Sequence, residues 1–510
     1  MEQDVTIVRR YRNKLLADPY RPGYHFAIPD DNAMSGDPNG AFYADGRYHL
    51  MYLYHNTASD AHHWGHISSI DLVHWRHHPD ALTAQDGDNG CYSGGAFVDK
   101  DRTAYLTFWK FPAKDGSDKG GICIARSRPP YDVWERMAPL AVESSDIWGV
   151  TDMTVNGQTM HLASADPSNI WKIDQYYYMQ AGNKPTLDAY GRAENANECY
   201  RGDWTDLYRS TDLRNWEYVH RFYTNPHSDA SWPDETEDNM CPTFLPLYDA
   251  KSGGKLTDKW LETFISHNKG AQYYVGTLQN EVFTPEVHGR MSWVDKSYFA
   301  PEAMLDDKGR QIIWAWLLGL HDSEYADYGW AGVLSFPRTL WWENNQLHMA
   351  PVAELDLLQY NHKSVPAAVC YNDLFIPVRN GRSFRMKAVI DPARAEFTGF
   401  RVCANSDGNE YTDIYYDCKS GHLVMDTTHS GTMGWNALEE APFTLEAGEK
   451  LHLDIFVDRS IVEVYANERQ AICRRIFPTD PQDAVGVHMI GGGSKLEQLD
   501  IWEMSPANMY

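Results

Sequence analysis

The sequence has few basic residues and no long apolar run, and both absences exclude classes of protein. It has 45 Lys and Arg against 71 Asp and Glu, a formal net charge of −26. Such a surface argues against nucleic acids and anionic membranes as partners, because phosphate groups attract basic proteins. No run approaches the roughly 18 apolar residues of a membrane span. The charged stretch 1–20 lacks the apolar core of a signal peptide. We therefore expect a cytoplasmic protein, and the sequence leaves its oligomeric state open.

Motifs for cofactors and metals are also missing. There is no GxGxxG, P-loop, GxSxG or HExxH pattern. The eight cysteines are scattered without CxxC spacing, which favours reduced thiols in the core. Six histidines lie close together in the sequence. Their strand-like spacing favours hydrogen bonds between neighbouring β-sheets (blades) over metal ligation. They are His62, His63, His66, His74, His77 and His78. We expect no cofactor and no metal.

Aromatic residues, in contrast, are abundant, with 18 Trp and 31 Tyr. They suit sugar-stacking surfaces, and they suit the packing of an all-β protein equally well. A turn with Asp followed by a short aromatic and aliphatic strand recurs five times, at 45–50, 101–106, 174–179, 258–264 and 307–314. Such repeats, with almost no helical periodicity, are typical of β-propeller blades. The sequence therefore predicts an all-β fold that begins with a five-bladed β-propeller.

The pattern changes near the C-terminus. Stretches 451–457, 461–465 and 484–489 alternate apolar and polar residues, which indicates half-buried antiparallel strands and hence a β-sandwich. We predict a propeller over 1–354, a linker over 355–369 that can hold a short helix, and a sandwich over 370–510.

Three motifs carry a resemblance to a known family. Asp37-Pro38-Asn39-Gly40 is by itself an ordinary tight-turn signature, but an aromatic strand follows it. Cys241-Pro242 and the stretch 456–467 are the other two. Together they resemble glycoside hydrolase family 32, the β-fructosidases that include invertases, inulinases and levanases. The resemblance implies a five-bladed propeller with a C-terminal sandwich. It also implies that Asp37 is the nucleophile that attacks the anomeric carbon of a fructofuranosyl unit.

A retaining glycosidase needs two carboxyl groups about 5–5.5 Å apart, and a third carboxylate can hold substrate hydroxyls. By resemblance, the third is Asp166 in Ala165-Asp166-Pro167, which stabilises the transition state. The family's Arg before this Asp is replaced by Ala165. Asp152 is an alternative that lacks the following Pro.

The general acid departs from the family pattern. The family places its catalytic Glu directly before Cys-Pro, where this chain has Met240, which has no proton to donate. We predict Glu237 as the acid, with Glu235 as the second choice, and Asp234 and Asp238 also lie nearby. The alternative interpretation is a solvated acidic loop.

The resemblance also implies that Asn56, Trp64 and Ser93 bind substrate, although Trp64 can equally pack between blades. The leading hypothesis is a retaining hydrolase of sucrose, fructo-oligosaccharides or fructans that acts through a fructosyl-enzyme. A fructosyltransferase or fructotransferase on the same site is the first alternative. A non-catalytic fructan-binding relative is the second, because Met240 stands at the position of the acid.

Overall fold

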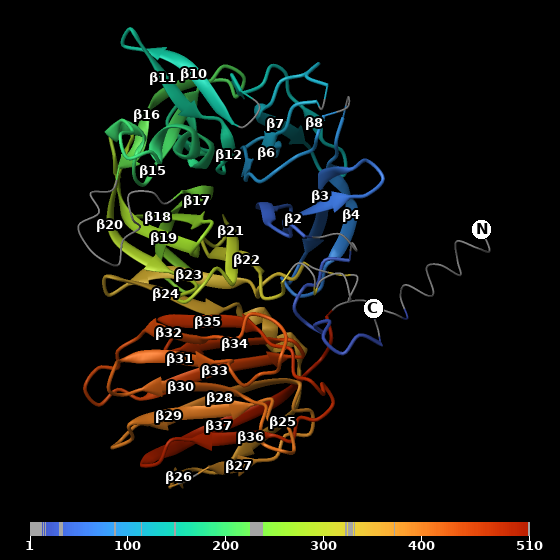
Figure 1. Ribbon diagram of the computed structural model, residues 1–510, viewed down its shortest axis with the longest axis vertical. Helices are drawn as coiled ribbons and strands as arrows, with labels where there is room; N and C mark the ends of the chain where they lie inside the picture. The colour runs from blue at the N-terminus through green and yellow to red at the C-terminus, as the bar shows by residue number, and fades with distance from the viewer. Residues whose placement is uncertain are drawn as a thin grey trace, which may run out of the picture.

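The structure is a computed structural model that describes residues 13, 15, 17–29, 34–85, 88–113, 115–146, 149–224, 238–321, 324, 330, 332–371 and 373–507. Its regular elements are almost all strands, as Figure 1 shows, which confirms the all-β class. The short helices are α2 (Lys184–Thr186), η1 (Leu187–Gly191), η2 (Glu198–Tyr200) and η3 (Ala353–Leu358). No helix among the described residues has the length and apolar character needed to cross a membrane.

The N-terminal part consists of consecutive antiparallel sheets, drawn from blue to yellow in Figure 1. The first holds β1 (Pro38–Ala44), β2 (Arg47–Asn56), β3 (Ala61–Ser69) and β4 (Arg76–Leu82). The second holds β5 (Ala96–Val98), β6 (Ala104–Lys110), β7 (Gly121–Ser127), β8 (Glu135–Arg136) and β9 (Val142–Glu143). A hairpin of β10 (Val150–Val155) and β11 (Gln158–Ala163) precedes the next sheet of β12 (Ala165–Pro167), β13 (Trp171–Ile173), β14 (Tyr176–Gly182), β15 (Trp204–Ser210) and β16 (Glu217–Thr224).

Two four-stranded sheets complete this part. One holds β17 (Met240–Ala250), β18 (Gly253–Ser266), β19 (Gly270–Gln279) and β20 (Val282–Arg290). The other holds β21 (Tyr298–Leu305), β22 (Gln311–Leu317), β23 (Arg338–Glu343) and β24 (Gln346–Pro351). Each sheet contacts the next, and β1 of the first contacts β21 of the last. The sheets therefore lie around a common centre, as in a β-propeller.

A buried carboxyl joins three of these sheets near the centre. Glu302 on β21 accepts hydrogen bonds from the backbone N–H of Ala41 at 2.7 Å and from the hydroxyl of Thr243 at 3.2 Å. Burial raises the pKa of Glu302 to about 8, so the group is neutral at physiological pH. The first strands of these three sheets, β1, β17 and β21, are thus fixed relative to one another.

The C-terminal part contains two antiparallel sheets packed face to face. One is formed by β25 (Gln359–Val365), β26 (Ala368–Cys370), β28 (Ser383–Asp391), β33 (Leu451–Asp458), β34 (Ile461–Ala466), β35 (Gln470–Arg475) and β37 (Ser494–Met504). The other is formed by β27 (Leu374–Ile376), β29 (Phe397–Val402), β30 (Thr412–Asp417), β31 (His422–Asp426), β32 (Leu438–Pro442) and β36 (Val487–Ile490). Their inner faces share one buried apolar cluster, the arrangement of a β-sandwich.

The two parts also share a core. Phe336 and Leu340 of the propeller lie in the same buried cluster as Phe456 and Ile461 of the sandwich. Buried charges cross this boundary as well: Arg338 lies 3.5 Å from Glu463. Burial raises the pKa of Glu463. The charge of Arg338 and a hydrogen bond from His25 outweigh this effect and lower the pKa to about 2. The interface is therefore apolar and ionic together, and both members of this ion pair are buried.

Candidate active site

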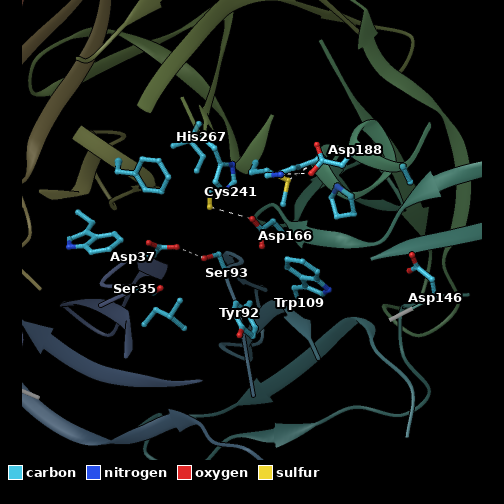
Figure 2. Close-up of a pocket in the computed structure, with 18 residues that line it drawn as sticks. Ser35, Asp37, Tyr92, Ser93, Trp109, Asp146, Asp166, Asp188, Cys241 and His267 are labelled. Carbon is cyan, nitrogen blue, oxygen red and sulfur yellow. Dashed lines mark hydrogen bonds and ion pairs between the residues drawn. The ribbon is translucent and has the colours of Figure 1, made fainter. Parts of the chain in front are cut away.

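A cavity of about 650 Å³ opens at the centre of the propeller, where Figure 2 shows its lining side chains. The volume is typical of a small-molecule site. Four aromatic side chains line it, which suits the apolar faces of a sugar ring. They are Tyr92, Trp109, Phe299 and Trp316. Among the described residues, four carboxyl groups also line it, namely Asp37, Asp146, Asp166 and Asp188.

The turn Asp37-Pro38-Asn39-Gly40 holds Asp37 in place. The Asn39 side chain donates to the carbonyl of Asp37 at 2.9 Å, and its amide oxygen accepts the N–H of Gly94 at 3.1 Å. Gly40 has φ +55, which its missing Cβ permits. The neighbouring Ser93 hydroxyl donates to Oδ2 of Asp37 at 2.7 Å. The first two sheets thus fix the carboxylate from both sides.

Asp166 comes from the third of these sheets and is equally fixed. Asn169, three residues later, exchanges two hydrogen bonds with the backbone of Phe244 on β17, at 2.8 and 3.0 Å. On the other side, a Cβ at Gly95 would lie 2.4 Å from the backbone N of Asn169, so only glycine allows this approach. The turn that carries Asp166 therefore packs between Gly95 on one side and Phe244 of β17 on the other.

The same irregularity recurs in four of the innermost strands. The pairing register shifts within β1, β12, β17 and β21. A residue with positive φ lies at each shift: Gly40, Asp166, Cys241 and Ala300. Bulges re-aim side chains, and strained backbone gathers at functional sites. The bulges turn side chains of several sheets toward one cavity.

The two acids of this cavity influence each other. Burial raises the pKa of Asp37 to about 6, although the Ser93 hydrogen bond and the charge of His267 lower it. Burial and then the negative charge of Asp37 raise the pKa of Asp166 to about 7. The pair therefore loses its first proton from Asp37 and holds a second on Asp166 near neutrality.

Met240 occupies the position where the family resemblance expects the acid, and Cys241 follows it as the Cys of the Cys-Pro motif. Met240 is buried, and its sulfur lies 3.4 Å from the backbone N of Lys184. The Cys241 thiol donates to Asp166 at 3.5 Å. Burial, with the charges of Asp166 and Asp37, raises the pKa of this thiol well above 9. Neither side chain is an effective proton donor to a substrate.

The predicted acid Glu237 and its second choice Glu235 lie outside the described residues. The described chain resumes at Asp238, which is buried. Its carboxylate accepts Nδ1 of His267 at 2.6 Å and the backbone N–H of His267 at 3.2 Å. His267 itself lines the cavity.

Asp37, Asp166 and Ser93 are thus brought together, whereas two other predicted site residues are not. Asn56 accepts the N–H groups of Ala58 and Ser59 in the turn after β2 and does not line the cavity. Trp64 is 0% exposed, in an apolar cluster with Phe108, so it does not reach a ligand in the cavity. This corrects its predicted substrate contact and agrees with the packing alternative.

Histidines in the first sheet form a hydrogen-bonded row. Nδ1 of His49 lies 2.9 Å from Nε2 of His66, and His78 bonds to Ser68 at 2.7 Å and to Asp132 at 2.6 Å. Asp132 lies between β7 and β8, so the row reaches the second sheet.

Sequence reasoning missed several lining residues. Trp109, Phe299 and Trp316 lie in strands whose alternation gives no sign of which residues face the centre. Lys184 and Asp188 come from α2 and η1, short elements without a sequence signature, and pair with each other.

Comparisons with known proteins agree with this architecture. The profile described as "Glycosyl hydrolases family 32 N-terminal domain" matches residues 25–351, and "Glycosyl hydrolases family 32 C terminal" matches 359–503. A sucrose-6-phosphate hydrolase of Zymomonas mobilis is 26% identical, over 97% of this chain and 94% of its own. A levanase of Bacillus subtilis is 26% identical, over 95% of this chain and 70% of its own.

Among solved structures, fructan 1-exohydrolase IIa of Cichorium intybus superposes with a TM-score of 0.77 at 21% identity, over 96% of this chain and 98% of that one. The profile matches cover most of the sequence and include every acid of the cavity. The chain belongs to glycosyl hydrolase family 32.

Proposed function

We propose that the protein is a retaining glycosidase that acts on β-fructofuranosides such as sucrose, fructo-oligosaccharides or fructans. The observation that carries this proposal is the pair of buried carboxyls, Asp37 and Asp166, in one aromatic-lined cavity. Near pH 6.5 their raised pKa values leave one negative charge, on Asp37. A carboxylate beside a protonated carboxyl suits one nucleophile and one hydrogen-bonding partner of the sugar.

In the proposed reaction, Asp37 attacks the anomeric carbon as the glycosidic oxygen leaves, which gives a covalent fructosyl-enzyme. Asp166 holds the fructosyl hydroxyls and stabilises the positive charge that develops on the ring. Water then attacks the same carbon and releases Asp37. Two displacements retain the β configuration.

The charge of the cavity supports a neutral substrate. Among the described lining residues, Lys184 is the one with a permanent positive charge, and its ammonium pairs with Asp188. Arg192 binds the same carboxylate from outside the cavity. A phosphorylated sugar would therefore meet several carboxyls without an unpaired Lys or Arg among the described lining residues, and like charges in a partly desolvated site repel strongly.

Incubation with sucrose, inulin, levan and sucrose-6-phosphate tests this proposal. We expect at least one neutral fructoside to release fructose, as the β anomer first, in NMR spectra recorded before mutarotation. We expect kcat/KM for sucrose-6-phosphate to be at least about tenfold below that for sucrose, a difference of about 1.4 kcal/mol. A preference for the phosphorylated sugar would contradict the neutral-substrate assignment. Release of α-fructose first would contradict retention.

Ser93→Ala is expected to move the acidic limb of the pH–rate profile upward by about one unit. The lost hydrogen bond stabilises ionised Asp37, such bonds contribute about 1.5–3 kcal/mol, and one pKa unit equals about 1.4 kcal/mol. A higher pKa leaves less Asp37 ionised at low pH, so the loss of kcat/KM is largest there and shrinks as pH rises. Ser35→Ala, at a cavity serine without a bond to Asp37, should leave this limb in place. An unmoved limb in Ser93→Ala would contradict the assignment.

Two other interpretations remain in the test. Transfer to a sugar hydroxyl in place of water would use the same residues and would yield oligosaccharides or dianhydrides in the product analysis. Binding without cleavage would follow if no fructoside reacted. Several expectations from the sequence remain predictions. They are the five-bladed count, the bounds 1–354, 355–369 and 370–510, the cytoplasmic location and the acid role of Glu237. The profile boundaries at 351 and 359 support the two-domain division.

A further inference from the structure

Cleavage by Asp37 requires a proton for the leaving oxygen, and the described cavity offers few donors. Met240 carries none, and the Cys241 thiol has a strongly raised pKa and is bonded to Asp166. Lys184 and Asp188 are paired with each other. His267 differs from these groups because its side chain is about half exposed, 46%, on the cavity wall.

We propose that His267 is the acid/base residue of this site and that Asp238 positions it; this inference rests on the proposed function. Nδ1 of His267 lies 2.6 Å from the Asp238 carboxylate, which also accepts the backbone N–H of His267 at 3.2 Å. The Nδ1 hydrogen therefore faces Asp238. Nε2, on the opposite edge of the ring, makes no hydrogen bond to any residue that the structure describes, and it is the nitrogen left to face a substrate.

The pairing of β17 with β18 brings the two residues together. Met240 is opposite Ile265 at the end of this pair, so two residues further Asp238 lies opposite His267. The hydroxyl of Ser266 donates to the carbonyl of Asp238 at 2.8 Å and closes the same end. The two residues directly flank the paired ends of β17 and β18, so the pairing of these strands sets their contact.

His267 lines the same cavity as the two acids. Its charge lowers the pKa of Asp37 and of Asp166. Figure 2 shows His267 beside Cys241, with Asp37 and Asp166 below them. Its ring meets the edge of Phe299, with centroids 5.8 Å apart.

The steps balance as follows. As Asp37 forms its bond to the anomeric carbon, the carbon–oxygen bond of the leaving group breaks and its electron pair stays on that oxygen. The oxygen takes the proton from Nε2 of His267, which becomes neutral. Water then attacks the same carbon, its proton passes to Nε2, and Asp37 leaves as carboxylate. His267 is protonated again at the end.

Asp238 is the positioning residue and not the donor, because its oxygens accept both hydrogens from His267 and it is buried behind the ring. Arg192 lies 3.9 Å from its other oxygen. The charged and titratable groups that face His267 are thus Asp238 and Arg192 behind it and the two cavity acids in front, with Lys296 over the Phe299 ring at 6.0 Å.

The test is His267→Asn, whose amide can still donate to Asp238 but which lacks Nε2. We expect sucrose turnover to fall by about 10²–10⁴-fold, the usual contribution of general acid–base catalysis. With an aryl fructoside whose leaving group needs no proton, formation of the fructosyl-enzyme should fall less than about tenfold. Azide should then accelerate turnover and yield β-fructosyl azide, because this anion attacks without a base. The alkaline limb of the pH profile should also disappear.

The matched control is His74→Asn. His74 makes the same two bonds to Asp71, through Nδ1 at 2.9 Å and the backbone N–H at 2.9 Å, but it is exposed and does not line the cavity. The His74→Asn variant should leave all rates unchanged. Asp238→Asn should reproduce the leaving-group contrast more weakly, since it misplaces the ring without removing it.

Glu237→Gln tests the competing assignment, in which Glu237 is the acid. If the leaving-group contrast and azide rescue appear in Glu237→Gln and not in His267→Asn, the inference is overturned while the proposed function stands. Equal losses of His267→Asn on natural and activated fructosides also overturn it, because they indicate damage to binding. If the wild-type protein cleaves no fructoside, the proposed function fails independently of His267.

Discussion

Asp37→Asn is expected to abolish turnover of fructosides, with a loss of about four to six orders of magnitude in kcat. The amide has the shape of the carboxylate but is a poor nucleophile, so the covalent step cannot proceed. It can still accept the Ser93 hydroxyl, which donates to Oδ2 at 2.7 Å in the wild type. Initial rates on the best fructoside, with a fold check by circular dichroism, measure this effect.

The same variant should bind substrate with an affinity close to that of the wild type, because the change removes charge and not volume. Calorimetric titration with an unreactive fructoside provides this control. Turnover of Asp37→Asn within about tenfold of the wild type would end the assignment of the nucleophile.

Asp166→Asn should produce the second largest loss, about 10²–10³-fold in kcat, with a smaller change in KM. Removing one preorganised partner of the developing charge costs about this much in other enzymes. Asn is the appropriate replacement because Asp166 has φ +35, a conformation that Asn tolerates better than Ala does. Steady-state kinetics separates the two parameters, and a loss confined to KM would reduce the role of Asp166 to ground-state binding.

The sequence predicted the all-β class from its repeats, and the family resemblance of two short motifs pointed to Asp37 and Asp166, whose catalytic roles stay predictions. Asp-Pro-Asn-Gly specifies its own backbone, and Ala-Asp-Pro marks a turn that the structure places at the same cavity. Local patterns of this kind survive in a single sequence, since they depend on φ preferences of neighbouring residues.

Features that depend on which face of a strand is covered could not be predicted in this way. The position of Trp64 fits the alternation of apolar residues in a strand. Its ring is buried near Phe108 because the second sheet packs against the first, which the alternation does not reveal. The Asp238–His267 contact is also invisible, because it depends on the register of β17 with β18 over 29 residues of sequence separation. The bulges of β1, β12, β17 and β21 have no common sequence motif either, since Gly40, Asp166, Cys241 and Ala300 are four different residue types.

The core shared by the propeller and the sandwich makes the protein a single folding unit. Phe336 and Leu340 would lose their cover if the sandwich were removed, and Arg338 would lose its partner Glu463. Each Å² of apolar surface left exposed in this way costs about 25 cal/mol. The sandwich is therefore not a detachable accessory, and truncation between the domains would yield aggregation rather than a smaller enzyme. Cooperativity of unfolding thus extends across two domains that topology alone would treat as independent.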